Sequence, residues 1–194
     1  YCIMGLIACD SGKIKLNNND ITTLPMWKRA QAGLGYLPQQ PSIFRGLSVE
    51  NNIMAILETT NFNFDQRLNR LEELLAEFNL THLRNAMPHQ LSGGERRKCE
   101  CARLLGTNPS YVLFDEPFSA LDPISINDIK SEINRLKEKG ISVIITDHQV
   151  REVLDISDYS YLLFSGEIIA HGTSDKILDN KEARKFYLGD KFKF

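Results

Sequence analysis

The chain has 194 residues, of which 42% are hydrophobic and 25% charged, and its formal net charge is −2. This length and apolar content suffice for one substantial core, so we expect a single domain over residues 1–194. The nearly balanced charge gives no electrostatic footprint for nucleic acid, and we expect no nucleic-acid partner. Because no apolar run approaches the roughly 18 residues of a spanning helix, we expect any membrane contact to go through a partner.

Strand and helix patterns alternate along the chain, which predicts an α/β domain with a largely parallel sheet. Residues 13–16 are predicted to form a strand that ends in the Asn-rich turn 17–20. Pro25 is expected to open a short helix, because its fixed φ suits the first helical position. The apolar run 34–36 predicts the next strand.

A run of helices without strands is predicted between residues 45 and 105. Its helices are expected at residues 48–57, 64–78 and 95–105. In the second of them, apolar side chains recur at helical spacing, and Asp65 is the predicted cap. These apolar positions are Leu68, Leu71, Leu75 and Phe78.

The C-terminal half returns to alternating elements. A strand at 111–114 precedes an amphipathic helix at 125–139, which Gly140 is expected to end at the C′ position. Its apolar face is predicted to carry Ile126, Ile129, Ile133 and Leu136. The remaining predicted elements are a strand at 142–146, a helix near 150–154, strands at 159–164 and 167–170 joined by a hairpin turn at Ser165-Gly166, and short helices at 174–178 and 181–187.

The four cysteines, Cys2, Cys9, Cys99 and Cys101, are not expected to form disulfides. Cys99 and Cys101 lie two residues apart on a predicted helix, so their side chains point in different directions and make a poor metal clamp. We expect them to be small apolar packing residues.

Residues 91–95 have the sequence Leu-Ser-Gly-Gly-Glu. The glycine pair exposes successive backbone N–H groups, and helix-forming residues follow as far as Leu105. This pattern predicts a helix N-terminus suited to an anion such as phosphate.

Two apolar runs end in polar side chains. The first runs into Asp115 and Glu116, and the second runs into Asp147 and His148. Parallel strands deliver ligand-binding groups at their carboxyl ends, which makes Asp115, Glu116 and His148 candidate site residues. One alternative is that Asp115 and Glu116 cap the next helix or pair with lysines. Another is that His148 is a structural residue whose hydrogen bonds are made within the fold. The other histidines lack such a setting and are expected to be structural: His82, His89 and His171.

Two further motifs, Leu37-Pro38-Gln39 and Ser119-Ala120-Leu121-Asp122, complete a set that resembles the ATP-binding subunits of ABC transporters, in that family's order and over the whole chain. The resemblance implies a P-loop-NTPase-like ABC ATPase fold, with a mostly parallel sheet and an inserted helical subdomain at approximately 45–105. It also implies ATP hydrolysis with ATP and Mg²⁺ as cofactors.

The resemblance assigns catalytic roles to four side chains. Asp115 would hold Mg²⁺, and Glu116 would polarise the attacking water. Gln39 would contact the metal and the water while sensing the transport partner; the alternatives are a plain polar loop residue or the same role for Gln40. His148 would donate a hydrogen bond to the γ-phosphate.

The resemblance also implies a homodimer in which two subunits pack head to tail. Ser92, Gly93 and Gly94 would then cap the nucleotide held by the other subunit, and Asp122 would lie at the dimer seam. No phosphate-loop motif G-x-x-x-x-G-K-[ST] occurs in the 194 residues. We therefore expect the chain to begin just past its own nucleotide cradle, with the end of the phosphate-loop helix at residues 1–6, and to be inactive as an ATPase by itself.

Residues 35–49, 169–173 and 186–192 resemble, more specifically, the ATPases of lipopolysaccharide export systems, which power extraction of lipopolysaccharide from the inner membrane of Gram-negative bacteria. That resemblance implies a cytoplasmic subunit, peripheral on the inner membrane, that binds transmembrane permeases through Phe44 and Arg45. The alternatives are that Phe44 is a core residue, that Arg45 is a solvated charge, and that the C-terminal segment is a frayed end.

Three other functions stay open at this stage. The first is the ATPase of a branched-chain amino-acid importer, whose sequences are close to those of lipopolysaccharide exporters. The second is a non-catalytic, truncated remnant that keeps the fold but not the activity. The third is a soluble ABC protein without a transport role, although such proteins usually carry two cassettes in one chain.

Overall fold

The computed structural model describes residues 1–119 and 121–188. The chain divides into two compact units. Unit 1 contains Tyr1–Asp115 and Arg135–Ile144, and unit 2 contains Glu116–Asn134 and the chain from Ile145 onward. No helix in the described ranges is both long enough and apolar enough to cross a membrane.

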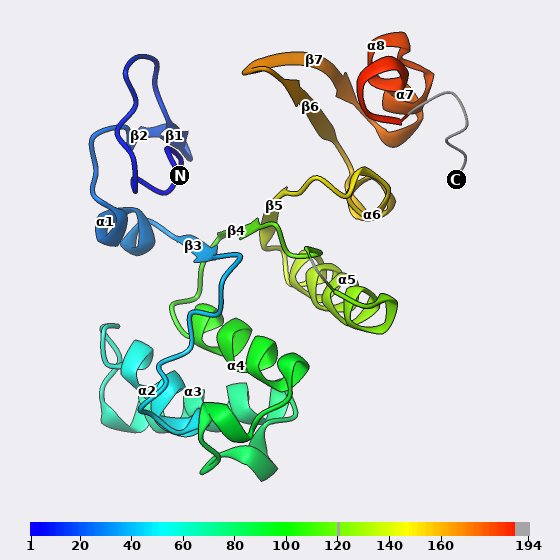
Figure 1. Ribbon diagram of the computed structural model, residues 1–194. Coiled ribbons are helices and arrows are strands. Elements are labelled where there is room, and N and C mark those ends of the chain that lie inside the picture. Colours follow the sequence, from blue (N-terminus) through cyan, green and yellow to red (C-terminus); the bar gives the residue numbers. More distant parts are fainter. Residues whose placement is uncertain (120, 189–194) are drawn as a thin grey trace. The chain divides into compact units, whose positions relative to one another are not determined.

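Parallel strand pairing in unit 1 confirms the predicted α/β class. Strand β3 (Leu34–Leu37) pairs in parallel with β4 (Tyr111–Asp115). With β5 (Ser142–Thr146) they form a sheet in the order β3-β4-β5 (Figure 1). All three strands lie where the apolar runs predict them, and β4 ends at the first of the two acids.

The N-terminal part of unit 1 is a small hairpin followed by a helix. Strand β1 (Lys15–Leu16) pairs antiparallel with β2 (Asn19–Asp20). The turn between them places Asn17 and Asn18 at φ values of 48° and 66°, which asparagine tolerates better than most residues. The predicted turn 17–20 is therefore correct only in its first half, because its second half pairs as a strand.

Helix α1 (Met26–Gln31) begins after Pro25, as predicted. Its Arg29 is 2% exposed, and the guanidinium donates hydrogen bonds to four backbone carbonyl oxygens. The acceptors are the carbonyls of Leu24, Cys2, Ile3 and Thr22, at 2.7 to 2.8 Å. Arg29 thus ties the first residues of the chain to the hairpin and to α1.

The helices between β3 and β4 fall inside the expected helical span. They are α2 (Val49–Leu57), α3 (Phe64–Glu77), the 3₁₀ turns η1 (Thr81–Leu83) and η2 (Pro88–Gln90), and α4 (Gly93–Leu105). The prediction of Asp65 as the cap of α3 is wrong. Asn63 caps it, because its side chain accepts from the Gln66 N–H at 2.9 Å while the Gln66 side chain accepts from the Asn63 N–H. Leu68, expected on the apolar face, is 38% exposed.

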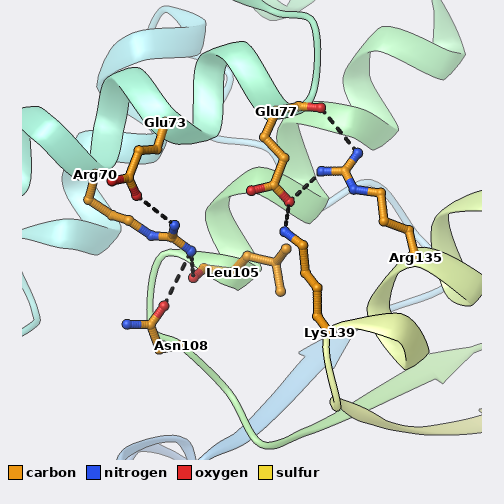
Figure 2. Close-up of polar contacts among 7 residues, drawn as sticks. All are labelled: Arg70, Glu73, Glu77, Leu105, Asn108, Arg135 and Lys139. Carbon is orange, nitrogen blue, oxygen red and sulfur yellow. Dashed lines mark hydrogen bonds and ion pairs between the residues drawn. The ribbon is translucent and has the colours of Figure 1, made fainter.

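Charged side chains fasten the middle and the C-terminal end of α3 to other parts of unit 1 (Figure 2). Near its middle, Arg70 pairs with Glu73 and donates to the Leu105 carbonyl at 3.3 Å and to Asn108 at 3.2 Å. At its C-terminus, the Glu77 carboxylate accepts from both Arg135 and Lys139. The helical region is thereby joined to the segment that leads into β5.

Unit 2 contains several helices and an antiparallel hairpin. Its elements are most of α5 (Pro123–Glu138), α6 (Val150–Ile156), β6 (Ser160–Phe164), β7 (Glu167–Gly172), α7 (Ser174–Asp179), α8 (Lys181–Ala183) and the π-helical turn η3 (Arg184–Leu188). Ser165 and Gly166 turn the hairpin with φ values of 50° and 84°, which confirms the predicted turn. Helices α6, α7 and α8 and strand β7 share a buried cluster of Leu154, Ala170, Ile177 and Ala183, and Figure 1 shows the hairpin that β7 forms with β6.

Helix α5 begins at Pro123, two residues before the predicted start, and Gly140 follows its end with a φ of 76°. Its side chains Ile129, Ile133 and Leu136 are buried, as the apolar spacing predicts. Lys130 of α5 pairs with Glu152 and Asp155 of α6, at 2.6 and 2.7 Å. Two sequence motifs lie partly outside the described residues: Ala120 of the Ser-Ala-Leu-Asp motif and residues 189–192 of the C-terminal segment.

The cysteines behave as the sequence predicts. All four are free thiols, and Cys99 and Cys101 are buried in α4. Burial raises the pKa of Cys99 to about 12, which keeps that thiol protonated and unreactive.

Candidate functional site

Helix α4 begins at the glycine pair of the Leu-Ser-Gly-Gly-Glu motif. Ser92 is its N-cap: the hydroxyl accepts from the Glu95 N–H at 3.3 Å, and the Glu95 carboxylate accepts from the Ser92 N–H at 2.8 Å. The backbone and side-chain hydrogen bonds from Ser92 lower the pKa of Glu95. Ser92 and Glu95 therefore form a capping box, and stabilisation of the helix N-terminus accounts for both residues.

Neither capping nor packing accounts for the two glycines. Gly93 and Gly94 are exposed, and a Cβ added to either would meet no atom of the described residues within 4 Å. Neither residue has a positive φ. Glycine within a helix costs about 1 kcal/mol relative to alanine, so the fold by itself gives no reason for this pair. The open helix N-terminus can accept an anion or a second molecule.

Asp115 lies at the carboxyl end of β4, where the apolar run predicts it. The Tyr36 hydroxyl on the neighbouring strand donates to its Oδ2 at 2.9 Å. Burial, together with this hydrogen bond, raises the pKa of Tyr36 and keeps the phenol protonated as a donor. Tyr36 is not among the site residues predicted above, although its place on the strand before Gln39 is a usable signal.

The loop after β3 carries Gln39, Phe44 and Arg45, all of which are exposed. Gln40 is exposed as well, so the structure does not separate the two glutamines. Phe44 is 43% exposed, which does not fit the alternative that it is a core residue. Its ring lies under the Arg103 guanidinium, 4.1 Å from Cζ to the ring centroid.

Buried polar side chains hold this loop against α2 and α4. The Glu100 carboxylate accepts from the backbone N–H groups of Ser42, at 2.5 Å, and Ile43, at 3.2 Å. Asn52 accepts from the Phe44 N–H at 2.8 Å and donates to the Phe44 carbonyl at 3.0 Å. Glu100 and Asn52 fix the backbone on which Phe44 is presented, and sequence reasoning missed both because their partners are set by the fold.

In unit 2, Glu116 and His148 lie next to each other. Glu116 Oε2 is 3.7 Å from His148 Nδ1, and the side chains are 39% and 64% exposed. Glu116 has a φ of 45°, in the left-handed region that costs a non-glycine residue on the order of 1 kcal/mol. Its N–H donates to the Thr146 carbonyl at 2.7 Å, which joins the segment after β4 to the end of β5.

Asp122 caps the first turn of α5. Its carboxylate accepts from the Ile124 N–H at 3.0 Å, from the Ser125 N–H at 3.1 Å and from the Ser125 hydroxyl at 2.6 Å. The bonds from Ser125 and Ile124 lower its pKa. A role in helix capping is thus sufficient to explain this aspartate within one subunit.

The candidate residues fall into two groups. Unit 1 holds Gln39, Phe44, Arg45, Ser92, Gly93, Gly94 and Asp115, whereas unit 2 holds Glu116, Asp122 and His148. The structure brings Glu116 and His148 together, and the Tyr36 hydroxyl donates a hydrogen bond to Asp115. In the described residues no group of three or more His, Cys, Asp or Glu could hold a metal ion. A single carboxylate such as Asp115 suits Mg²⁺, which commonly takes one or two carboxylates together with waters and substrate phosphates.

Comparison with related proteins identifies the source of these motifs. The family model described as ABC transporter matches residues 1–119. The lipopolysaccharide export system ATP-binding protein LptB of Haemophilus influenzae is 47% identical over 194 residues, which cover 100% of this chain and 80% of that protein. An ABC transporter ATP-binding protein of Rhizobium meliloti is 50% identical over 192 residues, or 99% of this chain and 71% of that protein.

Solved structures agree with the sequence relatives. An ATP-binding cassette of an ABC transporter, in its ADP conformation, superposes with a TM-score of 0.83 at 27% identity, over 97% of this chain and 81% of the other. The predicted ABC ATPase fold is therefore correct, and ATP binding is the property by which these relatives are described. The chain belongs to the ABC transporter family, as one of its ATP-binding proteins.

Proposed function

We propose that this chain is the ATP-hydrolysing subunit of a lipopolysaccharide exporter. The observation that carries the proposal is the identity of 46 to 47% over the whole chain to LptB proteins of Haemophilus influenzae and Escherichia coli. The exposed Phe44, clamped by Arg103 and Asn52 rather than buried, supports a docking role in the loop that resembles those proteins.

The chemistry we propose is hydrolysis of ATP with Mg²⁺. Asp115 and Gln39 would hold the ion, which neutralises phosphate charge when bound. Glu116 orients and polarises the attacking water, and His148 donates to the γ-phosphate. The distance of 3.7 Å between Glu116 and His148 supports a shared role, because both groups can then reach one substrate.

The active assembly in this proposal is a head-to-tail homodimer bound to transmembrane permeases at the cytoplasmic face of the inner membrane. The open space around Gly93 and Gly94 supports the capping of a nucleotide held by the other subunit. Asp122 lies at the seam, in addition to capping α5. Phe44 and Arg45 dock the permeases from the loop that leads into the helical subdomain at approximately 45–105.

The catalytic assignment is tested in a loop-extended chain, which is this chain joined at Tyr1 to a phosphate-loop segment of the family. In it, Glu116→Gln keeps the size and hydrogen bonding of the side chain but weakens polarisation of the water. We expect turnover to fall by about 10²-fold or more, since that is the usual contribution of a general base. ATP binding should survive, and ATP-bound dimers should accumulate in gel filtration. His148→Ala should also abolish turnover; normal phosphate release by either variant would remove that residue from catalysis.

The transport branch is tested by partner choice. The loop-extended chain should co-purify from membranes with the permeases of a lipopolysaccharide exporter and not with those of a branched-chain amino-acid importer. The reverse result would favour the importer. A loop-extended chain that binds neither set and hydrolyses no ATP would support the non-catalytic remnant.

A further inference from the structure

Asp147 is a buried carboxylate to which the sequence motifs assign no role. Its side chain is 0% exposed. Oδ2 accepts from the Phe118 N–H at 2.9 Å, and Oδ1 accepts from the Gln149 N–H at 2.8 Å. One side chain thus bridges the backbone of the segment after Glu116 and the backbone of the segment that carries His148.

Further hydrogen bonds join the same two segments of unit 2. The Glu116 N–H donates to the Thr146 carbonyl at 2.7 Å, and the Gln149 side-chain amide donates to the Phe118 carbonyl at 2.5 Å. Donors therefore run in both directions between residues 116–118 and 146–149. These contacts tie the two segments to each other.

Burial makes the bridge energetically demanding. A buried carboxylate is tolerated when its oxygens are hydrogen-bonded, and a buried N–H that loses its acceptor costs about 1 to 3 kcal/mol. Glu116 also needs support, because its φ of 45° persists only where the surroundings determine it. Asp147 supplies such support without reaching a substrate itself.

We propose that Asp147 is a positioning residue that fixes Glu116 and His148 in their mutual arrangement. The inference rests on the proposed function for the roles of those two side chains. Asp147 acts through the backbone of Phe118 and Gln149, which flank them. Its Oδ1 also lies 3.7 Å from His148 Nδ1, the same ring nitrogen that Glu116 Oε2 approaches at 3.7 Å.

The structural arm of the test uses the 194-residue chain and measures amide hydrogen exchange. Asp147→Asn keeps one acceptor oxygen but turns an NH₂ donor toward the other N–H. We expect protection of the Phe118 or the Gln149 amide to fall about tenfold or more, in line with loss of one buried hydrogen bond. The matched control is Asp179→Asn at the exposed end of α7, which should change neither amide. Unchanged protection of both amides in Asp147→Asn would overturn the bridge.

The kinetic arm uses the loop-extended chain. Asp147→Asn should lower kcat about 10- to 100-fold, the usual result of a small misplacement of catalytic groups, and should leave KM for ATP unchanged. In a Glu116→Gln background the same substitution should cost less, because one of the two groups that it positions is already disabled. A cost of equal size in both backgrounds, or a rise in KM alone, would show a role independent of Glu116 and overturn the inference.

The two proposals fail in different ways. If Glu116→Gln retains normal turnover, the proposed catalytic role is refuted and the positioning inference falls with it. If Glu116→Gln is inactive while Asp147→Asn turns over normally, only the positioning inference is refuted.

Discussion

The salt-bridged end of α3 allows a quantitative prediction about stability. Glu77 accepts from Arg135 and Lys139 with its carboxylate, and its backbone carbonyl accepts from Arg135 at 3.1 Å (Figure 2). Glu77→Gln removes the charge but keeps the size of the side chain. Both cations remain, and the backbone contact is untouched. The substitution therefore isolates the charged part of the interaction.

The expected loss follows from the burial of these groups. The Glu77 side chain is 18% exposed, while those of Arg135 and Lys139 are 31% and 38% exposed. Fully exposed pairs contribute about 0.2 to 1 kcal/mol and hydrogen bonds to charged groups about 1.5 to 3 kcal/mol. Allowing for solvent screening, we expect Glu77→Gln to cost about 1 to 2 kcal/mol. In a chain of this size that lowers Tm by about 2 to 8 °C.

The loss should depend on pH in a defined direction. Burial by itself raises the pKa of Glu77, but the hydrogen bonds from Lys139 and Arg135 outweigh it and bring the pKa below its ordinary value of 4.5. A lowered pKa in the folded state gives stability that is fully present above about pH 4.5 and is lost as pH falls through the folded pKa. The difference between the parent chain and Glu77→Gln should therefore shrink at acidic pH.

The assay is thermal unfolding of both chains from neutral pH down to about pH 3. Glu73→Gln is the matched control, because Glu73 lies on the same helix and pairs with Arg70 while 62% exposed. It should cost at most about 0.5 kcal/mol. Equal losses in the two variants, or a Glu77→Gln loss that persists unchanged at low pH, would refute the reasoning.

Two further predictions concern activity and assembly. The 194 residues by themselves should release no phosphate above background, because no residue in them replaces the phosphate-loop lysine; turnover comparable to that of the loop-extended chain would contradict this. Phe44→Ala in the loop-extended chain should weaken assembly with the permeases by about 2 kcal/mol or more, as for other aromatic anchors, while ATP binding persists. Co-purification of normal amounts of permease, or outright unfolding of the variant, would show that Phe44 does not dock them.

Local sequence patterns predict most of the individual elements correctly. The strand at 142–146 and the turn at Ser165-Gly166 lie as expected, because alternation and turn chemistry act between neighbours in the chain. The errors arise where two nearby residues can both fill the same structural role and the sequence does not show which of them does. Asn63 and Asp65 can both cap a helix, and the reciprocal bond with Gln66 selects Asn63.

The sequence by itself determines which residues are candidates for chemistry. Asp115, Glu116 and His148 stand out because each follows an apolar run. The glycine pair stands out because glycine is less favourable in a helix than alanine. Such signals depend on spacing along the chain and need no knowledge of distant contacts. They also suffice for the family, which the relatives then confirm.

The tertiary structure decides which groups hold those candidates in place. Tyr36 reaches Asp115 across 79 positions, Glu100 reaches Ser42 across 58, and Asp147 reaches Phe118 across 29. No local preference encodes these pairs, because each is created when strand pairing and helix packing bring separate segments together. A buried polar group needs a hydrogen-bond partner. In these pairs the partner comes from a distant segment, which only folding brings close.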